Sequence, residues 1–206
     1  MTGIWILGGG GHAKVALATL AADGKAIAGL YDDDPAKQGL RLLGHEIIGV
    51  TPPEDWWNSE TRSAFIAIGS NKIRERVAAR RANWAVARHP AAHVHATVAL
   101  AAGTLVCAGV VIQPDTCLGA HAIANTACSI DHDCRIGDFA HIAPGAHLAG
   151  GVTVGARSFI GIGASIGPGV RIGDDVTVGA GAVVLRDIPH GETWVGVPAR
   201  STGNAG

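Results

Sequence analysis

From residue 94 to residue 189 the chain repeats one pattern of apolar and polar positions every six residues. This segment holds sixteen units without an insertion, and the first position is Leu, Ile or Val in fifteen of them, Ala124 being the exception. The fifth position is mostly small, and the fourth is Gly or Asp in eleven units. A large and a small side chain facing a narrow core, then a corner that takes a positive φ, predict one short strand per unit. A β-sandwich has no reason to keep one period over sixteen units, so the pattern favours a β-solenoid.

Before the repeat, apolar runs alternate with glycine turns and helical patterns. Residues 4–7 run into four consecutive glycines, and residues 13–22 predict a helix. Further apolar runs follow at 26–31 and 64–68. Strand, glycine turn, helix and strand in this order predict a βαβ unit and a small parallel sheet. We therefore expect an α/β domain over residues 1–88 and a β-helix with a C-terminal tail over residues 89–206.

Residues 72–81 predict a further helix that follows the third apolar run. Asn71 is a candidate N-cap of this helix. The helix carries most of the clustered basic side chains and is expected to be solvated; they are Arg74, Arg76, Arg80 and Arg81.

Composition excludes several classes of protein. The formal net charge is -1, so no strong field favours nucleic acid or an anionic membrane. No apolar stretch reaches the roughly 18 residues of a transmembrane helix, and the N-terminus has no basic segment typical of a signal peptide. The four cysteines form no CxxC pair, which argues against a disulfide framework or a zinc knuckle. We expect a cytoplasmic protein with no membrane insertion.

One repeat unit, residues 130–135, carries the strongest chemical signal. His132 stands at the third position of its unit, at a corner, and Asp133 follows it. A histidine can accept a proton near neutral pH, and a neighbouring carboxylate orients it and favours its protonated form. The same residues also fit a polar corner with no chemical role, and spacing alone does not decide between the two.

The repeat resembles the left-handed parallel β-helix of the hexapeptide acyltransferases. In that family three units form one triangular coil, so residues eighteen apart stack, and the sixteen units here would give a little over five coils. Residues 195–200 also look like the closing segment of that family.

Two further segments narrow the resemblance. Residues 125–134 and the glycine-rich residues 8–14 are similar to the sialic-acid O-acetyltransferase-like and nucleotide-amino-sugar N-acetyltransferase proteins. This resemblance implies a Rossmann-like first domain that holds the nucleotide of a sugar substrate, acetyl-CoA as co-substrate, and no metal. It implies His132 as catalytic base, with Asp133 raising its basicity. The implied acetyl-CoA-binding residues are Asn125, His141, Gly150, Ile162 and Ala180, although the family often has Gly in place of Ala180. The implied substrate-binding residues are Gly10, Gly11, His12, Asp32, Asp33 and Gly69.

Stacking by eighteen also sorts the outward sixth positions into columns. One column is largely apolar: Leu105, Ile123, His141, Phe159 and Thr177. Exposed apolar patches of this kind are usually covered, and the family's solution is a homotrimer with its coils side by side. In this column His141 also fits a simple filler, hydrogen-bonded to a neighbour.

Three other classes compete with the acyltransferase. Gly8, Gly10, Ala13 and Asp32 imitate a dinucleotide fingerprint, but only half of such a fold precedes the repeat. A metal-dependent β-helix hydratase would use histidines of neighbouring coils, here His121, His132, His141 and His147. An inactive β-helix leaves the His132–Asp133 pair and the glycine turn unexplained.

The acceptor is the least defined part of the prediction. We favour transfer to the 4-amino group of a UDP- or GDP-linked 4-amino-4,6-dideoxy sugar destined for a bacterial surface glycan. The alternative is O-acetylation of a sugar of the sialic-acid type. The two acceptors use the same base, and the sequence does not choose between UDP and GDP.

Overall fold

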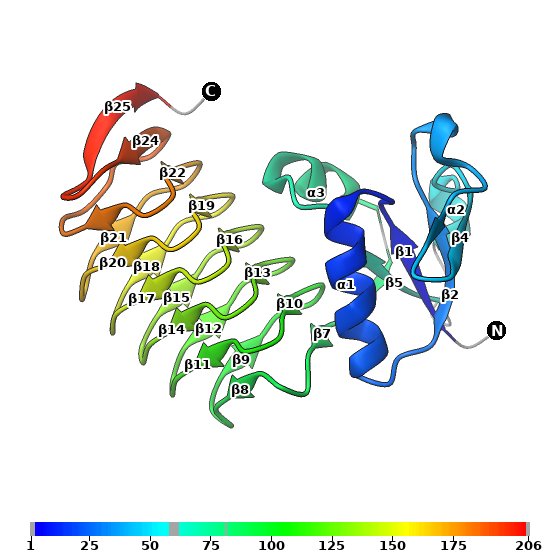
Figure 1. Cartoon of the computed structure of the whole chain (residues 1–206), viewed down its shortest axis with the longest axis horizontal. Coiled ribbons are helices and arrows are strands. Elements are labelled where there is room, and N and C mark those ends of the chain that lie inside the picture. Colours follow the sequence, from blue (N-terminus) through cyan, green and yellow to red (C-terminus); the bar gives the residue numbers. More distant parts are fainter. Residues whose placement is uncertain (1–2, 58–61, 81, 205–206) are drawn as a thin grey trace.

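The computed structural model describes residues 3–57, 62–80 and 82–204, in two parts that lie side by side (Figure 1). The first part is an α/β domain and the second is a left-handed parallel β-helix, which confirms the fold class expected from the sequence. Within these ranges, no helix has the length and apolar character that crossing a membrane requires.

The small domain is built on a six-stranded sheet in the order β3-β4-β2-β1-β5-β6. Neighbouring strands are parallel, except for the hairpin of β3 and β4. The strands are β1 (Ile4–Leu7), β2 (Ile27–Tyr31), β3 (Arg41–Leu42), β4 (His45–Gly49), β5 (Ser63–Ile66) and β6 (Asn83–Trp84). The helices are α1 (Gly11–Ala22), α2 (Glu54–Trp57) and α3 (Asn71–Ala78), with a 3₁₀ turn η1 (Pro35–Lys37). The predicted parallel sheet is present, and short edge strands extend it.

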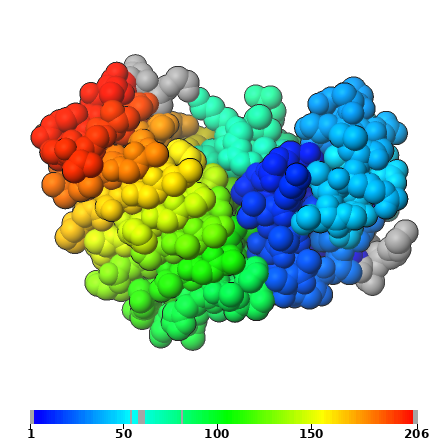
Figure 2. Space-filling model, in the orientation of Figure 1, coloured from blue at the N-terminus to red at the C-terminus, as the bar shows by residue number. Residues whose placement is uncertain are grey.

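Helix α1 lies between this sheet and the β-helix (Figure 1). Its buried residues are Ala13, Ala16, Leu17, Thr19 and Leu20. A helix that is apolar on several sides is buried on several sides, and small alanines let the neighbouring elements approach closely. The apolar side chains of α1 belong to the same core cluster as those of the β-helix, so the two parts pack into one body (Figure 2).

The β-helix has three faces of stacked, mostly two-residue strands. Face 1 consists of β7 (Ala87–Arg88), β10 (Leu105–Val106), β13 (Ile123–Ala124), β16 (His141–Ile142), β19 (Phe159–Ile160), β22 (Thr177–Val178) and β24 (Glu192–Val195), with β25 (Arg200–Asn204) antiparallel at its end. Face 2 consists of β8 (His93–Val94), β11 (Val111–Ile112), β14 (Ser129–Ile130), β17 (His147–Leu148), β20 (Ser165–Ile166) and β23 (Val183–Val184). Face 3 consists of β9 (Ala99–Leu100), β12 (Cys117–Leu118), β15 (Arg135–Ile136), β18 (Thr153–Val154) and β21 (Arg171–Ile172).

Residues eighteen apart stack in register on every face, as the sequence predicts, until the last coil, where Thr177 pairs with Thr193 and Ile172 with Ile188. Leu105 pairs with Ile123, for example, and Ser129 with His147. Strand β7 already pairs with β10, so the stacking begins at Ala87, just before the boundary expected after residue 88. The faces meet at three edges. Edge 1–2 joins faces 1 and 2, edge 2–3 joins faces 2 and 3, and edge 3–1 joins faces 3 and 1.

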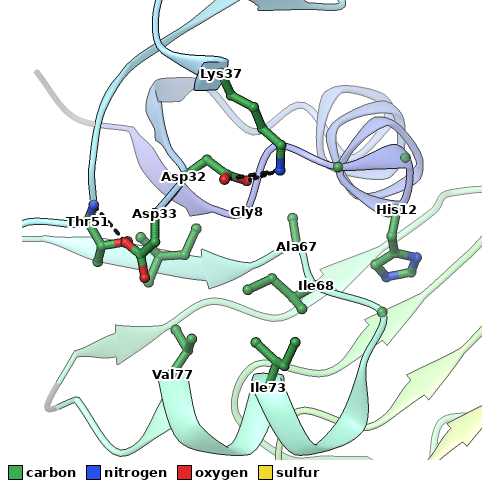
Figure 3. Close-up of a pocket in the computed structure, with 14 residues that line it drawn as sticks. Gly8, His12, Asp32, Asp33, Lys37, Thr51, Ala67, Ile68, Ile73 and Val77 are labelled. Carbon is green, nitrogen blue, oxygen red and sulfur yellow. Dashed lines mark hydrogen bonds and ion pairs between the residues drawn. The ribbon is translucent and has the colours of Figure 1, made fainter. Parts of the chain in front are cut away.

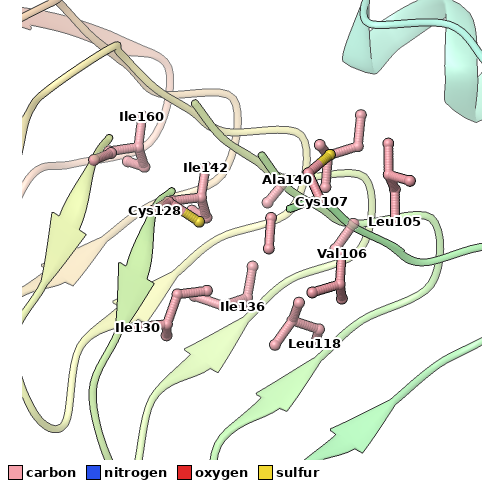
Figure 4. Close-up of a cluster of buried hydrophobic side chains, with 14 of the residues drawn as sticks. Leu105, Val106, Cys107, Leu118, Cys128, Ile130, Ile136, Ala140, Ile142 and Ile160 are labelled. Carbon is pink, nitrogen blue, oxygen red and sulfur yellow. The ribbon is translucent and has the colours of Figure 1, made fainter. Parts of the chain in front are cut away.

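The repeat explains both the core and the edges. First-position side chains such as Val106, Ile130 and Ile142 are fully buried inside the coils (Figure 4). The fourth position has φ between 55° and 73° in fourteen consecutive units, from Gly103 to Gly181. The coil therefore imposes this conformation even where the residue is bulky, as at edge 3–1, where it falls on His121, Phe139 and Arg157.

The chain's own small domain covers the first part of the apolar outward column of face 1, whereas Phe159 and Thr177 are half-buried. Leu105 is 1% exposed, Ile123 is 2% exposed and His141 is 7% exposed in a single chain. The first two join the core cluster that includes α1. The expectation that a second copy covers this column is therefore wrong for Leu105 and Ile123, because their cover is intramolecular.

Candidate active site

A cavity of about 380 Å³ opens in the small domain where the glycine turn, η1, the end of β5 and α3 meet (Figure 3). All six residues that the sequence predicts to bind substrate line it: Gly10, Gly11, His12, Asp32, Asp33 and Gly69. They come from the ends of separate parallel strands, where ligands of α/β sheets usually bind. The structure thus brings the whole predicted set together.

Two glycines shape the turn and two others leave it open. Gly8 has φ of +108°, and a Cβ there would lie 2.7 Å from the side chain of Ile68. A Cβ on Gly9 would lie 2.5 Å from a side chain of β4. A Cβ on Gly10 or Gly11 would meet nothing within 4 Å. Helix α1 begins at this point without a side-chain cap, so its unobstructed start suits an anionic group such as phosphate.

Asp32 connects the glycine turn to η1 on the polar side of the cavity. Its carboxylate accepts hydrogen bonds from the backbone N–H of Gly9 at 2.6 Å and of Asp34 at 2.9 Å. The ammonium group of Lys37 lies 3.1 Å from both carboxylate oxygens. Burial opposes ionisation of Asp32, but the two N–H groups and Lys37 together lower its pKa. Lys37 also lines the cavity, and the sequence analysis did not single it out.

The cavity has one polar side and one apolar side. Asp33 accepts a hydrogen bond from the backbone N–H of Thr51 at 3.1 Å. Ile68, Ile73 and Val77 line the wall below it (Figure 3). A concave site with an apolar wall and a few fixed polar groups is typical of small-molecule binding, and it suits the base and phosphates of a nucleotide.

Replacing Asp32 by alanine is expected to weaken binding of the sugar nucleotide. The change frees the Gly9 N–H and Lys37, and hydrogen bonds to a charged group contribute about 1.5–3 kcal/mol each, so an affinity loss of roughly tenfold or more follows. The affinity for acetyl-CoA should stay nearly unchanged. Initial-rate kinetics with each substrate varied in turn measure both, and Asp23→Ala, at the far end of α1, is the control. A shift confined to acetyl-CoA would show that this cavity binds the other substrate.

His132 and Asp133 form an exposed pair at edge 2–3. Nδ1 of His132 lies 2.8 Å from Oδ2 of Asp133, and the two side chains are 60% and 66% exposed. This hydrogen bond raises the pKa of His132, and the nearby charge of Asp131 adds to the effect. Because Asp133 engages Nδ1, the other ring nitrogen, Nε2, is left to exchange a proton with a ligand.

Gly150 stacks one coil above His132 and accommodates its ring. A Cβ at this position would lie 2.6 Å from Nε2 and from Cε1 of His132. The missing side chain therefore makes room for the imidazole, in addition to any ligand. Within the described chain no backbone acceptor pairs with the Gly150 N–H, whereas its carbonyl accepts from Gly169. A free N–H beside a basic nitrogen is suited to bind a developing oxyanion.

Asn125 and His141 lie on the other side of the β-helix, beneath the small domain. Both are 7% exposed, and Asn125 Nδ2 is 3.0 Å from His141 Nε2. Oδ1 of Asn125 accepts from the N–H of Thr126, so Nδ2 donates and the proton of a neutral His141 stands on Nδ1. Burial, then Arg74 and His12, lower the pKa of His141 to about 3. The His12 ring from the cavity is 5.9 Å away, so substrate-binding and acetyl-CoA-binding candidates meet here.

The remaining candidates stand elsewhere on the coils. Ile162 and Ala180 lie at edge 1–2, and Ile162 is 60% exposed. In one chain the candidates therefore occupy separate edges. The cavity adjoins face 1, whereas His132 is on edge 2–3, which is opposite face 1 in a triangular coil.

The histidines considered for a metal site are similarly dispersed. His121 is at edge 3–1, His132 at edge 2–3, His141 on face 1 and His147 on face 2. Among the described residues, no group of three His, Cys, Asp or Glu side chains is arranged to hold a metal ion.

Helix α3 differs from the solvated helix that the sequence predicts. Arg74 is only 1% exposed, although Arg76 is exposed, and Arg81 lies outside the described residues. The N-cap is Ser70, so the prediction of Asn71 was wrong by one residue. Nothing in the local sequence distinguishes Arg74 from its neighbours, because the partners that bury it include carbonyls of the β-helix far along the chain.

A glycine-turn α/β domain packed on a hexapeptide β-helix, with an exposed His–Asp pair on its coils, defines a hexapeptide-repeat acyltransferase. Family models agree: residues 3–81 match the PglD N-terminal domain and residues 151–186 match the bacterial transferase hexapeptide repeats. The chain belongs to the PglD-type family of hexapeptide acetyltransferases, and it is an acetyltransferase.

Solved structures support this membership over nearly the whole chain. PerB of Caulobacter crescentus, in complex with CoA and GDP-perosamine, is 42% identical with a TM-score of 0.90, over 98% of this chain and 97% of that one. A mutant of perosamine N-acetyltransferase from the same organism, with the same two ligands, is 40% identical with a TM-score of 0.91, over 98% and 97%. The acetyltransferase domain of PglB from Neisseria gonorrhoeae is 37% identical with a TM-score of 0.89, over 98% of this chain and 100% of that one. WeeI from Acinetobacter baumannii is 25% identical with a TM-score of 0.84, over 96% and 98%. No curated protein sequence matches the chain.

Proposed function

We propose that the enzyme transfers the acetyl group of acetyl-CoA to the 4-amino group of a UDP- or GDP-linked 4-amino-4,6-dideoxy sugar for a bacterial surface glycan. The observation that carries this proposal is the 42% identity, over 98% of the chain, to an enzyme whose structure contains CoA and GDP-perosamine. Similar structures from Caulobacter crescentus are named perosamine N-acetyltransferase, which favours nitrogen over the hydroxyl acceptor of the O-acetylating alternative. A cytoplasmic location follows as part of the proposal, since acetyl-CoA and sugar nucleotides are supplied there.

The chemistry assigned to the β-helix needs one base and one oxyanion donor. Nε2 of His132 takes a proton from the sugar amine as its nitrogen attacks the thioester carbonyl carbon. The Gly150 N–H stabilises the negative charge on the carbonyl oxygen, and the carbon–sulfur bond then breaks to release CoA. Asp133 orients the imidazole and favours its protonated form. Asn125, His141, Ile162 and Ala180 are the proposed acetyl-CoA contacts.

A thiol-release assay tests the substrate class. Acetyl-CoA is presented with GDP- and UDP-linked 4-amino-4,6-dideoxy sugars, with their 4-hydroxyl counterparts, and with a free sialic acid. We expect CoA release only with an amino sugar, and mass spectrometry should show an added acetyl group on its nitrogen. Release with the hydroxyl acceptors alone would replace this proposal by the O-acetylating one.

We also propose that the working form is a homotrimer. The support is the arrangement of the candidates: the cavity adjoins face 1, and His132 stands on the opposite edge of the same β-helix. A sugar nucleotide bound in the cavity would therefore meet the His132 of another copy. The separation of the cavity from His132 in one chain, and not the apolar column of face 1, is therefore the reason to expect a trimer.

Complementation measures this arrangement directly. Assayed well below the KM for the sugar nucleotide, His132→Ala chains and Asp32→Ala chains are each expected to be weakly active, and mixed trimers of the two should regain activity because some sites combine an intact cavity with an intact His132. Light scattering on the wild-type enzyme should give three times the chain mass. A monomer at micromolar concentration, or mixtures that never exceed their separate activities, would contradict the shared site.

A further inference from the structure

Helix α3 is fastened to the β-helix by polar side chains on one of its sides. Asn71 Nδ2 donates to the carbonyl of Arg157 at 2.7 Å and of Ser158 at 3.2 Å. Glu75 pairs with the Arg157 guanidinium at 3.1 Å. Arg74, between them, is the most buried of the three, at 1% exposure. Hydrogen bonds and an ion pair therefore hold α3 against edge 3–1, in addition to apolar contacts.

The Arg74 guanidinium donates hydrogen bonds to acceptors on both sides of the domain junction. Nε donates to the His121 carbonyl at 2.8 Å, and Nη2 donates to the Phe139 carbonyl at 2.6 Å. On the other side, Nη1 donates to the carbonyls of Ile68 at 3.0 Å and Gly69 at 3.1 Å. Nη2 also reaches Asn71 Oδ1 at 2.9 Å. One planar group therefore connects two successive coils to the segment between β5 and α3.

The β-helix carbonyls involved are those that the coils leave free. His121 and Phe139 are fourth-position residues with φ of 55° and 59°. No backbone N–H among the described residues donates to either of their carbonyls. Buried acceptors of this kind need a partner, and the planar fork of arginine supplies several donors in fixed directions. Lysine, with a single nitrogen, cannot reach acceptors on both sides of the junction.

Burying a cation at this position costs desolvation free energy. Among the described residues, the hydrogen-bond acceptors of Arg74 are neutral carbonyl or amide oxygens, and burial lowers its pKa to about 10, so it is still charged at pH 7. Where packing alone matters, apolar side chains generally serve as well or better than a buried charge. The arrangement instead specifies one relative orientation of the two parts.

The segment that Arg74 holds is a wall of the cavity. Ile68 and Gly69 both line it, and the His12 side chain lies 3.6 Å from where a Cβ of Gly69 would stand. The guanidinium also lies close enough to His12 and His141 to lower the pKa of each. Any tilt of α3 would therefore move the cavity wall relative to Asn125 and His141.

We propose that Arg74 is a positioning residue for acetyl transfer: it sets the placement of the nucleotide cavity relative to the β-helix, so that the bound sugar amine reaches the acetyl donor. This inference rests on the proposed function, because it assumes a sugar nucleotide in the cavity and acetyl-CoA on the coils. Arg74 touches neither reacting group, so its effect should fall on turnover more than on binding.

The test separates kcat from binding in Arg74→Lys, with Arg76→Lys, on the exposed side of the same helix, as matched control. Misplacement of reacting groups by about 1 Å can cost about 100-fold, so we expect kcat to fall about 10- to 100-fold. The KM for acetyl-CoA should change much less, and so should the Kd for GDP or UDP, whichever the wild-type enzyme binds in calorimetry. Arg76→Lys should behave as wild type.

Asn71→Ala provides a milder variant should Arg74→Lys fail to fold. It removes one acceptor of Arg74 and two bonds to the β-helix, so the same selective fall in kcat is expected at smaller size. A folded variant that melts at lower temperature but turns over at the wild-type rate would reduce Arg74 to a stabilising role and overturn the inference. Failure of the proposed function looks different, because the wild-type enzyme itself would then release no thiol with any amino sugar.

Discussion

Replacing His132 by alanine is expected to lower kcat by about 10²–10⁴-fold, the usual contribution of a general base. Both Michaelis constants should stay within a few-fold of wild type, because the base acts mainly in the transition state. The side chain is 60% exposed at an edge, so its removal should not disturb folding. Steady-state kinetics and the unfolding temperature measure the two effects.

Asp133→Asn distinguishes a tuned base from a passive corner residue. The hydrogen bond with the Asp133 carboxylate raises the pKa of His132, and the charge of Asp133 adds to this, so loss of the carboxylate should move the acidic limb of the kcat/KM profile to lower pH and cost less activity than His132→Ala. His95→Ala, another exposed histidine of the β-helix, is the control.

A trimeric His132→Ala enzyme with full kcat would refute the mechanism. His141 is a poor substitute as base, since its pKa is lowered to about 3.

Acid should unfold the protein through three histidines at the domain junction. Burial is the main cause that lowers the pKa of His12 to about 4, of His121 to about 4 and of His141 to about 3. Arg74 lowers all three further; Asp138 opposes this shift at His121, and a hydrogen bond with the Gly69 backbone opposes it at His141. These side chains bind protons in the unfolded chain below its pKa of about 6.5 but not in the folded one.

The sign of the effect follows from this difference in bound protons. Above pH 6.5 neither state is protonated and stability is unaffected, whereas between about pH 6 and pH 4 the unfolded state gains protons and the free energy of unfolding falls. Each histidine contributes up to about 1.4 kcal/mol per pH unit, so the three together give at most about 4 kcal/mol per pH unit. Urea unfolding at pH 7, 6 and 5 measures this slope.

His121→Phe is the matched variant for the acid effect. The ring of His121 stacks on Phe139 at 5.3 Å and contacts Trp84 edge-on at 5.0 Å, so phenylalanine keeps these contacts without a titrating group. It should reduce the slope by up to a third. Stability that stays constant from pH 7 to pH 5 would contradict the prediction.

The β-helix could be predicted in detail because its rules are local. Each unit of six residues forms its own strand and corner, so inward residues such as Ile130 and the corner residue Asp133 can be recognised from their neighbours alone. The residues that line the cavity could be predicted for a similar reason. Gly10, Asp32 and Gly69 each follow an apolar strand, and the ends of parallel strands meet at one edge of a sheet.

The sequence by itself therefore determined the coils, their register, the glycine-turn domain and the His132–Asp133 pair. Only the tertiary structure decided how the small domain covers face 1: it buries Leu105 and Ile123 within the chain and turns Arg74 from an expected surface residue into a buried link. It also decided that Gly150 makes room for the imidazole of His132. The physical reason is that burial and hydrogen bonding of these residues depend on partners tens of residues away, and an arginine or an outward leucine has the same local signal whether water or another domain meets it.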